Sequence, residues 1–211
     1  MKGKSIALIV AHPDDETLWA GGTILGHTEW KWYIISLCRK SDQERATKFF
    51  GALKILGAEG VMGDLDDGPE QFPLDEAEVK STILDLLPHR HFDILVTHHP
   101  YGEYTRHLRH EETARAVIHL WNDHMIEASS LWTFAYHDGG GAYPPKADVS
   151  ADILYKLPES LWRKKYALVI DHYGFSTNSF EAKATTHEEA FWHFDKREDA
   201  IDWLNKLTIR Q

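Results

Sequence analysis

Hydrophobic residues along the first two thirds of the chain follow two alternating patterns. Short runs that are apolar at consecutive positions are typical of central strands in a parallel sheet covered on both faces. They occupy residues 5–11, 31–38, 92–99 and 131–137. Between them, apolar residues recur every three or four positions, which indicates helices over residues 41–57, 74–89 and 110–125. This alternation predicts an α/β fold, a Rossmann-like three-layer sandwich with a mostly parallel central sheet.

Local signals mark the ends of these elements. Ser41 and Glu44 have the spacing of a capping box at the start of one helix, and Gly57 suits its end. The segment 138–150 is rich in Gly and Pro and predicts a loop. The residues after it carry mostly helical patterns. We therefore expect a single domain over residues 1–211, in which residues 150–211 could form a helical C-terminal subregion.

Composition narrows the class of protein. The chain has 211 residues, of which 43% are hydrophobic and 27% charged, as in soluble globular domains. A net charge of -10 disfavours nucleic acid and anionic membranes as partners. No signal peptide or membrane span is expected, because charges follow the first apolar run after six residues and no 18-residue apolar run exists. With one cysteine, Cys38, the sequence favours a cytoplasmic protein whose thiol is buried rather than nucleophilic.

Polar side chains cluster where three predicted strands end. Open parallel sheets bind ligands at the carboxyl ends of their strands, so these segments should converge. They read "HPDDE" from His12, "HHPYGEYTRHLRH" from His98 and "HDGG" from His137. Imidazole and carboxylate groups suit zinc, and a catalytic zinc takes three protein ligands. His107 and His110 are three apart at the start of a helix and face the same side.

A second interpretation needs no metal. The same residues could be solvated loop charges, with Asp14 or Asp15 favouring the start of the following helix through its cap and dipole. Residue types and spacing alone leave both interpretations open.

Two motifs together carry a resemblance that covers most of the first 140 residues. "AHPDDE" after the first strand, followed near mid-chain by "THHPYGEYTRHLRHEETARAV", resembles the LmbE-like, or PIG-L, family of zinc-dependent N-acetylglucosaminyl deacetylases. The resemblance implies a hydrolase that removes the N-acetyl group from an N-acetylglucosamine-type sugar or its conjugate. It implies that one Zn²⁺ is held by His12, Asp15 and His110. It also implies that Asp14 is the general base toward water and that His107 stabilises the tetrahedral intermediate.

The second motif departs from the family pattern at two places. Arg106 looks like an inserted residue, which could displace Tyr104 from an oxyanion role. Leu108 and Arg109 replace a Pro-Asp pair, and this puts a cation where a carboxylate is usual. Arg109 could therefore weaken metal binding or instead meet an anionic substrate.

The other polar residues near the strand ends have both a functional and an ordinary interpretation. We expect Arg39, Tyr104, Arg109 and His137 to contact substrate. For Arg45 and for the acidic residues in 64–70 we expect solvent exposure. One of His98 and His99 is expected to orient a metal ligand, and Trp19 is expected in the core or in a wall that stacks on a sugar.

Other functions remain open at this point. They are a same-family amidase acting on a larger conjugate, a metal phosphoesterase, and a non-catalytic Rossmann-like binding protein. A phosphoesterase would prefer two metals and more carboxylates, and the first strand lacks the glycine-rich loop of nucleotide binders. The expected partner is a small amino-sugar substrate. The sequence allows a homo-oligomer and does not name the acetylated substrate.

Overall fold

The computed structural model describes residues 3–209 and is organised around a seven-stranded sheet of order β3-β2-β1-β4-β5-β9-β8. Five parallel strands form most of it: β1 (Ser5–Val10), β2 (Lys31–Cys38), β3 (Glu59–Leu65), β4 (His91–Thr97) and β5 (Glu127–Phe134). Two antiparallel strands complete one edge: β9 (Glu188–Phe194), beside β5, and β8 (Ile153–Lys156). The predicted α/β fold with a mostly parallel sheet is confirmed.

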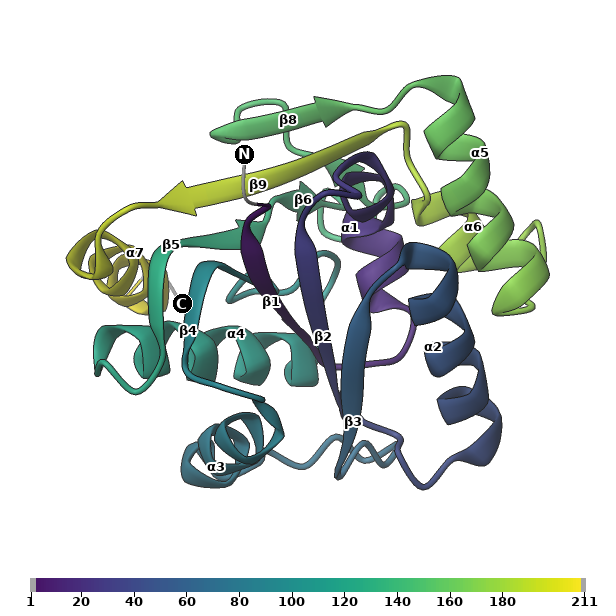
Figure 1. Ribbon diagram of the computed structural model, residues 1–211. Coiled ribbons are helices and arrows are strands. Elements are labelled where there is room, and N and C mark those ends of the chain that lie inside the picture. Colours follow the sequence, from purple (N-terminus) through teal and green to yellow (C-terminus); the bar gives the residue numbers. More distant parts are fainter. Residues whose placement is uncertain (1–2, 210–211) are drawn as a thin grey trace.

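Helices cover both faces of the sheet (Figure 1). One layer contains α1 (Asp15–Gly26), α2 (Gln43–Leu56) and α5 (Glu159–Ala167), which continues into a π-helical turn (Leu168–His172). The other contains α3 (Glu76–Leu86), α4 (Leu108–Asn122) and α7 (Arg197–Ile209). Side chains of β1 alternate between the two resulting cores: Ile6 and Leu8 enter one, Ala7 and Ile9 the other. A central strand buried on both faces explains the continuous apolar run in its sequence.

The three predicted helices correspond to α2, α3 and α4, and one predicted cap is wrong. Asp42, not Ser41, caps α2: its carboxylate accepts a hydrogen bond from the Arg45 amide at 3.0 Å. The Ser41 amide and hydroxyl both donate to Asp64 Oδ1 at 3.0 Å. Gly57 ends the helix as expected, with a φ of 70° that favours glycine.

Three strands of the sheet escaped the sequence analysis. The sequence of β3, EGVMGDL, carries two glycines that weaken the strand pattern. Beyond residue 150, β8 and β9 join the central sheet, so this region is not only helical. It also contains α6 (Phe180–Ala184), while the short pair β6 (Tyr136–His137) and β7 (Lys146–Ala147) precedes it.

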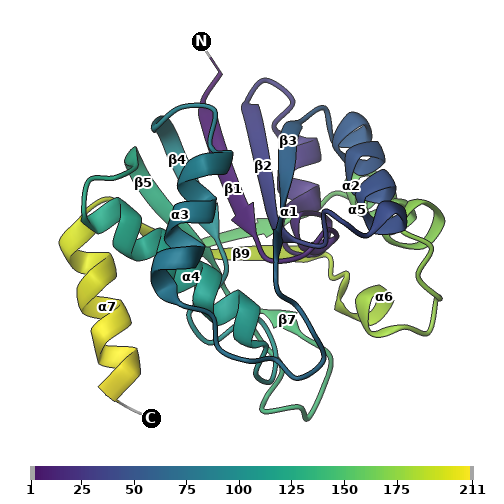
Figure 2. The same ribbon diagram turned by 90° about the horizontal axis from the view of Figure 1, so that it is seen from below.

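The strand order places a crevice beside β1. The chain runs from β1 outward to β2 and β3, then returns to β4 on the other side of β1. At such a reversal the connections after the two central strands diverge to opposite faces, which opens a ligand site at their carboxyl ends. Figure 2 shows α6 and β7 at the end of the molecule toward which β1 points.

Two further expectations concern the burial of Cys38 and the question of membrane-spanning helices. Cys38 is buried at the end of β2, as predicted, with 1% of its surface exposed. Every helix within residues 3–209 is too short or too polar to span a membrane.

Candidate metal centre

The crevice beside β1 holds a cavity of about 190 Å³. Its walls come from the turn after β1, the starts of α1 and α2, the residues that follow β2 and β3, the loop before α4, and α6. The lining residues are His12, Pro13, Asp14, Asp15, Leu18, Trp19, Arg39, Arg45, Asp67, Tyr104, His107, Phe180 and Glu181. The residues after β1 and β4 therefore converge, as predicted, whereas the third segment, which begins at His137, does not line this cavity.

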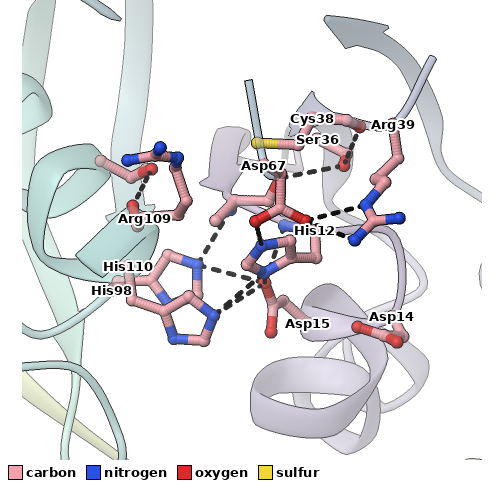
Figure 3. Close-up of polar contacts among 12 residues, drawn as sticks. His12, Asp14, Asp15, Ser36, Cys38, Arg39, Asp67, His98, Arg109 and His110 are labelled. Atoms are coloured by element: carbon pink, nitrogen blue, oxygen red, sulfur yellow. Dashed lines mark hydrogen bonds and ion pairs between the residues drawn. The ribbon is translucent and has the colours of Figure 1, made fainter. Parts of the chain in front are cut away.

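Three donor atoms meet beneath this cavity (Figure 3). His12 Nδ1 lies 3.2 Å from Asp15 Oδ2 and 3.2 Å from His110 Nε2. Asp15 Oδ2 lies 3.4 Å from His110 Nε2. A tetrahedral zinc with bonds of about 2.0–2.1 Å keeps its ligand atoms about 3.3–3.4 Å apart. The three residues that the resemblance implied as ligands thus have donor atoms at a spacing that fits one metal ion.

Each histidine of this trio has a carboxylate on its other ring nitrogen. Asp67 Oδ1 lies 3.2 Å from His12 Nε2, and Glu103 Oε2 lies 2.6 Å from His110 Nδ1. Metal-binding histidines almost always donate this second N–H to a carboxylate or carbonyl, which fixes the tautomer and the ring orientation. This pairing, on fully or mostly buried side chains, is a second feature that fits a metal site.

Asp15 is held by further contacts. The Trp19 indole donates to Oδ1 at 3.0 Å, and the His12 amide donates to Oδ2 at 2.8 Å. Burial alone would raise the pKa of Asp15, but the imidazoles of His110 and His98 lower it well below its usual value. The carboxylate is therefore ionised and ready to bind a cation.

His98 also lies within reach of this cluster, and Asp15, His98 and His110 could form an alternative ligand set. However, the Ala11 amide donates to His98 Nε2 at 3.0 Å, and Nδ1 is 3.0 Å from Glu103 Oε2. Both ring nitrogens are thus occupied by the protein. His98 contacts Asp15 and His110 and thereby supports their orientation. This is the role predicted for either His98 or His99.

His107 stands beside the cluster without a hydrogen bond to it. Its ring centroid is 4.6 Å from that of His12 and 4.5 Å from that of His110. Burial, together with the neighbouring imidazoles, lowers the pKa of His107 to about 3, so the ring is neutral. Its buried Nδ1 has no hydrogen-bond partner among the described residues. His107 lines the cavity, and with His12 and His110 it forms another group of side chains that could hold a metal ion.

Asp14 occupies a different environment from Asp15. Its backbone has a φ of 134°, and its amide donates to Glu16 Oε2 at 3.0 Å. Arg45 Nη1 donates to Asp14 Oδ2 at 3.0 Å. Burial and the adjacent Asp15 carboxylate raise the pKa of Asp14 well above its usual value. Arg45 was expected in solvent; 39% of its side chain is exposed, and it also lines the cavity.

Two of the four predicted substrate contacts reach the cavity. Arg39 lies at its mouth with 46% of its side chain exposed and pairs with Asp67 at 2.8 Å. Tyr104 lines the cavity, and its ring lies 5.9 Å from that of His107. The extra residue Arg106 does not displace it, because Arg106 turns outward and pairs with Glu111 at 2.7 Å.

The other two predicted substrate contacts, Arg109 and His137, do not reach this cavity. Arg109 is 2% exposed, and in Figure 3 its guanidinium points away from the cluster of His12, Asp15 and His110. His137 is exposed on β6, where its Nδ1 lies 2.7 Å from the Tyr143 hydroxyl. It lines a separate cavity on the far side of Tyr104. Neither residue lines the cavity beside the candidate metal centre, and contact with substrate stays a prediction for both.

Several residues of the site were missed. Asp67 was expected in solvent, but its side chain is 7% exposed and contacts His12. If β3 had been recognised in the sequence, Asp67 would have been placed at the carboxyl edge of the sheet, beside the residues that follow β1. Glu103 stood within the quoted second motif without an assigned role. Phe180 and Glu181 on α6 carry no local signal, since only the tertiary fold brings them to the cavity.

Comparison with known proteins identifies the family. Residues 7–121, more than half of the chain, match the family PIG-L, described as GlcNAc-PI de-N-acetylase. The chain belongs to the PIG-L family. A mimivirus relative, protein L374 of Acanthamoeba polyphaga mimivirus, is 22% identical over 177 residues, covering 77% of this chain and 75% of its own. The PIG-L match ends before α6, so Phe180 and Glu181 lie outside it.

Solved structures share the PIG-L chain's fold. The 4-carboxy-2-hydroxymuconate hydratase GalB of Pseudomonas putida KT2440 is 16% identical, with a TM-score of 0.61 over 90% of this chain and 95% of its own. The zinc-inhibited form of the teicoplanin deacetylase Orf2 is 13% identical, with a TM-score of 0.60 over 85% and 90%. At this identity the likeness shows the fold, which serves a hydratase as well as a deacetylase. Membership of the PIG-L family supports a deacetylase.

Proposed function

We propose that this protein is a zinc-dependent hydrolase that removes the N-acetyl group from an N-acetylglucosamine-type sugar or its conjugate. The observation that carries the proposal is the trio of donor atoms 3.2–3.4 Å apart on His12, Asp15 and His110. Asp14, a carboxylate outside that trio, lines the same cavity. Family membership supports the same reaction class.

In this proposal His12, Asp15 and His110 hold one zinc ion. When bound, zinc would supply the Lewis acidity that polarises an amide carbonyl and makes water more acidic. Asp67 and Glu103 hold the two imidazoles in the orientation that binding needs.

The protein's own groups would move the proton. A carboxylate that is not itself a ligand can take a proton from water and deliver it to the departing amine. Asp14 Oδ1 or Oδ2 is suited to this because the raised pKa lets the carboxyl hold a proton between the two steps. The neutral ring of His107 would donate an N–H to the developing oxyanion.

The cavity walls suit a hydroxylated ring. Arg39, Arg45 and Glu181 offer charged groups to sugar hydroxyls or to a substituent. Phe180 and Tyr104 offer aromatic faces, with ring centroids 4.8 Å apart. We take residues 1–211 as one catalytic domain, supported by the joining of β8 and β9 to the central sheet. A single cysteine, which allows no internal disulfide, supports a cytoplasmic location.

Two measurements test the proposal. Metal analysis of the purified protein should find one zinc per chain, and a panel of N-acetylglucosamine derivatives should release free amine and acetate. Amine release only from larger acyl conjugates would favour the amidase alternative. Two metals per chain would favour a phosphoesterase. No metal and no turnover would leave a non-catalytic binding protein.

A further inference from the structure

Arg109 is one of the most deeply buried charged side chains in the described part of the chain, and none of its contacts belongs to the candidate metal centre. Its Nε donates to the Asp66 carbonyl at 2.6 Å, and one Nη donates to the Phe72 carbonyl at 2.7 Å. The other Nη bonds Glu112, one turn further along α4. A buried guanidinium is costly unless such partners neutralise and saturate it. Both carbonyls belong to the loop that follows β3, so Arg109 holds this loop in place.

Glu112 holds the same loop at a third point. Its Oε1 accepts a hydrogen bond from the Leu74 amide at 2.8 Å. The backbone is thus fixed from α4 at residues 66, 72 and 74. Apolar contacts of this segment are limited: Phe72 is 67% exposed, and Leu74 is half-buried against the core. Arg109 and Glu112 therefore fix the backbone of this loop directly to α4.

Asp67 is the residue that this loop presents to the metal centre. One carboxylate oxygen lies 3.2 Å from His12 Nε2 and accepts a hydrogen bond from the side-chain Nε2 of Gln71 at 3.1 Å. The other accepts from Arg39 Nε at 2.8 Å. Asp67 follows directly on Asp66, whose carbonyl Arg109 holds. A shift of this backbone by even 1 Å would break the long contact to His12.

We propose that Arg109 is a positioning residue for the metal centre: by gripping the loop after β3, it holds Asp67 against the outer nitrogen of His12. The inference rests on the proposed metal site and accounts for a cation next to His110. The guanidinium points away from the metal centre and is neutralised by Glu112. It therefore affects the metal centre only by holding the loop. A lysine could not replace it, because one ammonium group lacks the planar fork that reaches two carbonyls and a carboxylate together.

Metal affinity of the metal-free protein tests this without reference to catalysis. Zinc would be titrated into wild type, D67N, R109K, R109M and the double variant R109K/D67N, with a chelating dye as competitor. We expect D67N to bind zinc about 10–100-fold more weakly, the usual cost of losing a carboxylate partner of a histidine ligand. R109K and R109M should be weakened by a similar factor. The double variant should be no weaker than D67N, because both changes break one connection.

Matched controls separate positioning from general stability. R197K alters another guanidinium that bonds a main-chain carbonyl and a glutamate, at Trp121 and Glu127, away from the site; it should bind zinc like wild type. Urea unfolding of each metal-free variant measures the structural contribution. If Arg109 only stabilised the fold, R109K would unfold more easily and keep its zinc affinity, and the proposal would be wrong. If R109M does not fold, E112Q takes its place in the zinc titration, because Glu112 bonds Arg109 and holds the same loop.

The remaining outcomes are distinct. Additive losses in R109K/D67N would overturn the route through Asp67. A wild-type protein that binds no zinc would overturn the metal site itself and this inference with it. Zinc binding that follows the expected pattern, in a protein that releases no amine from any sugar, would overturn the proposed reaction and leave the role of Arg109 standing.

Discussion

Asp14 and Asp15 are consecutive in the chain, yet their carboxylates have different partners. Asp15 Oδ2 lies 3.2–3.4 Å from ring nitrogens of His12, His98 and His110, whereas Asp14 Oδ2 pairs with Arg45 at 3.0 Å. The unusual backbone of Asp14, with its φ of 134°, lies between the end of β1 and the start of α1. The two carboxylates can therefore be altered one at a time, which allows metal binding to be separated from proton transfer.

Removal of a proposed ligand should remove the metal. Asp15→Ala and His110→Ala should each retain far less than one zinc per chain after dialysis, because two ligands cannot close a zinc site. Metal analysis of the dialysed proteins measures this. His119→Ala serves as control, since His119 lies on the same helix and pairs with Glu76 at the surface. Stoichiometric zinc in both ligand variants would exclude those residues from the site.

Asp14→Asn should keep its zinc and lose its activity. Asparagine preserves the shape and a contact with Arg45, but it cannot accept a proton. Turnover should fall by about 10²–10⁴, the usual contribution of a positioned acid–base group. Steady-state rates and metal content, measured on the same preparation, check both parts. If the variant is nearly as active as wild type, the base lies elsewhere, and His107 is the next candidate.

The parts of the site that sequence predicted are those with strong local patterns. The apolar run of β1 and the crowded polar residues after it marked both the strand and its functional end. Asp67 was assigned to solvent because glycines at 60 and 63 hide β3, so its place at the carboxyl edge of the sheet went unrecognised. The orientation of Arg109 depends on carbonyls more than 35 residues away, which no local pattern reports.

Phe180 should contribute to substrate affinity rather than to chemistry. It is 40% exposed at the cavity, and its ring packs on Tyr104 at 4.8 Å. If it stacks on the substrate ring, Phe180→Ala should raise KM by about 2–10-fold, which corresponds to about 0.5–1.5 kcal/mol for an aromatic contact, while kcat stays near normal. Phe50→Ala is the control, because Phe50 is 42% exposed on α2 outside the cavity. Equal effects of the two substitutions would remove Phe180 from the binding surface.

Cys38 should make stability fall at alkaline pH. Burial raises the pKa of its thiol above the usual value, so the folded protein keeps the proton after the unfolded chain, with a thiol pKa of about 8.5, has lost it. The unfolded state then binds fewer protons, and the unfolding free energy decreases as pH rises past about 8.5. Urea unfolding between about pH 8 and 10 should show this slope, and Cys38→Ala should reduce it. An unchanged slope in the variant would assign the effect to other groups.

A buried ion pair should dominate the attachment of the C-terminal region to α1. Lys165 on α5 lies 2.7 Å from Glu189 on β9, and both side chains are fully buried. Glu189 also accepts hydrogen bonds from the Gly22 and Thr23 amides of α1, at 2.8 and 2.6 Å. Removal of one partner leaves the other charge buried without compensation, which costs about 3–5 kcal/mol. Lys165→Met and Glu189→Gln should each lower the unfolding free energy in urea by that amount.

A second ion pair, on the exposed side of α5, serves as the control for this prediction. Arg163 and Glu159 form an ion pair on the exposed side of α5, with 72% and 55% of their side chains accessible. Exposed pairs contribute about 0–1 kcal/mol, so Arg163→Met should be nearly neutral. The double variant Lys165→Met/Glu189→Gln should cost less than the sum of the single changes, because the two groups share one interaction. If Lys165→Met costs no more than Arg163→Met, the buried pair does not hold the C-terminal strands to the helix that carries Asp15.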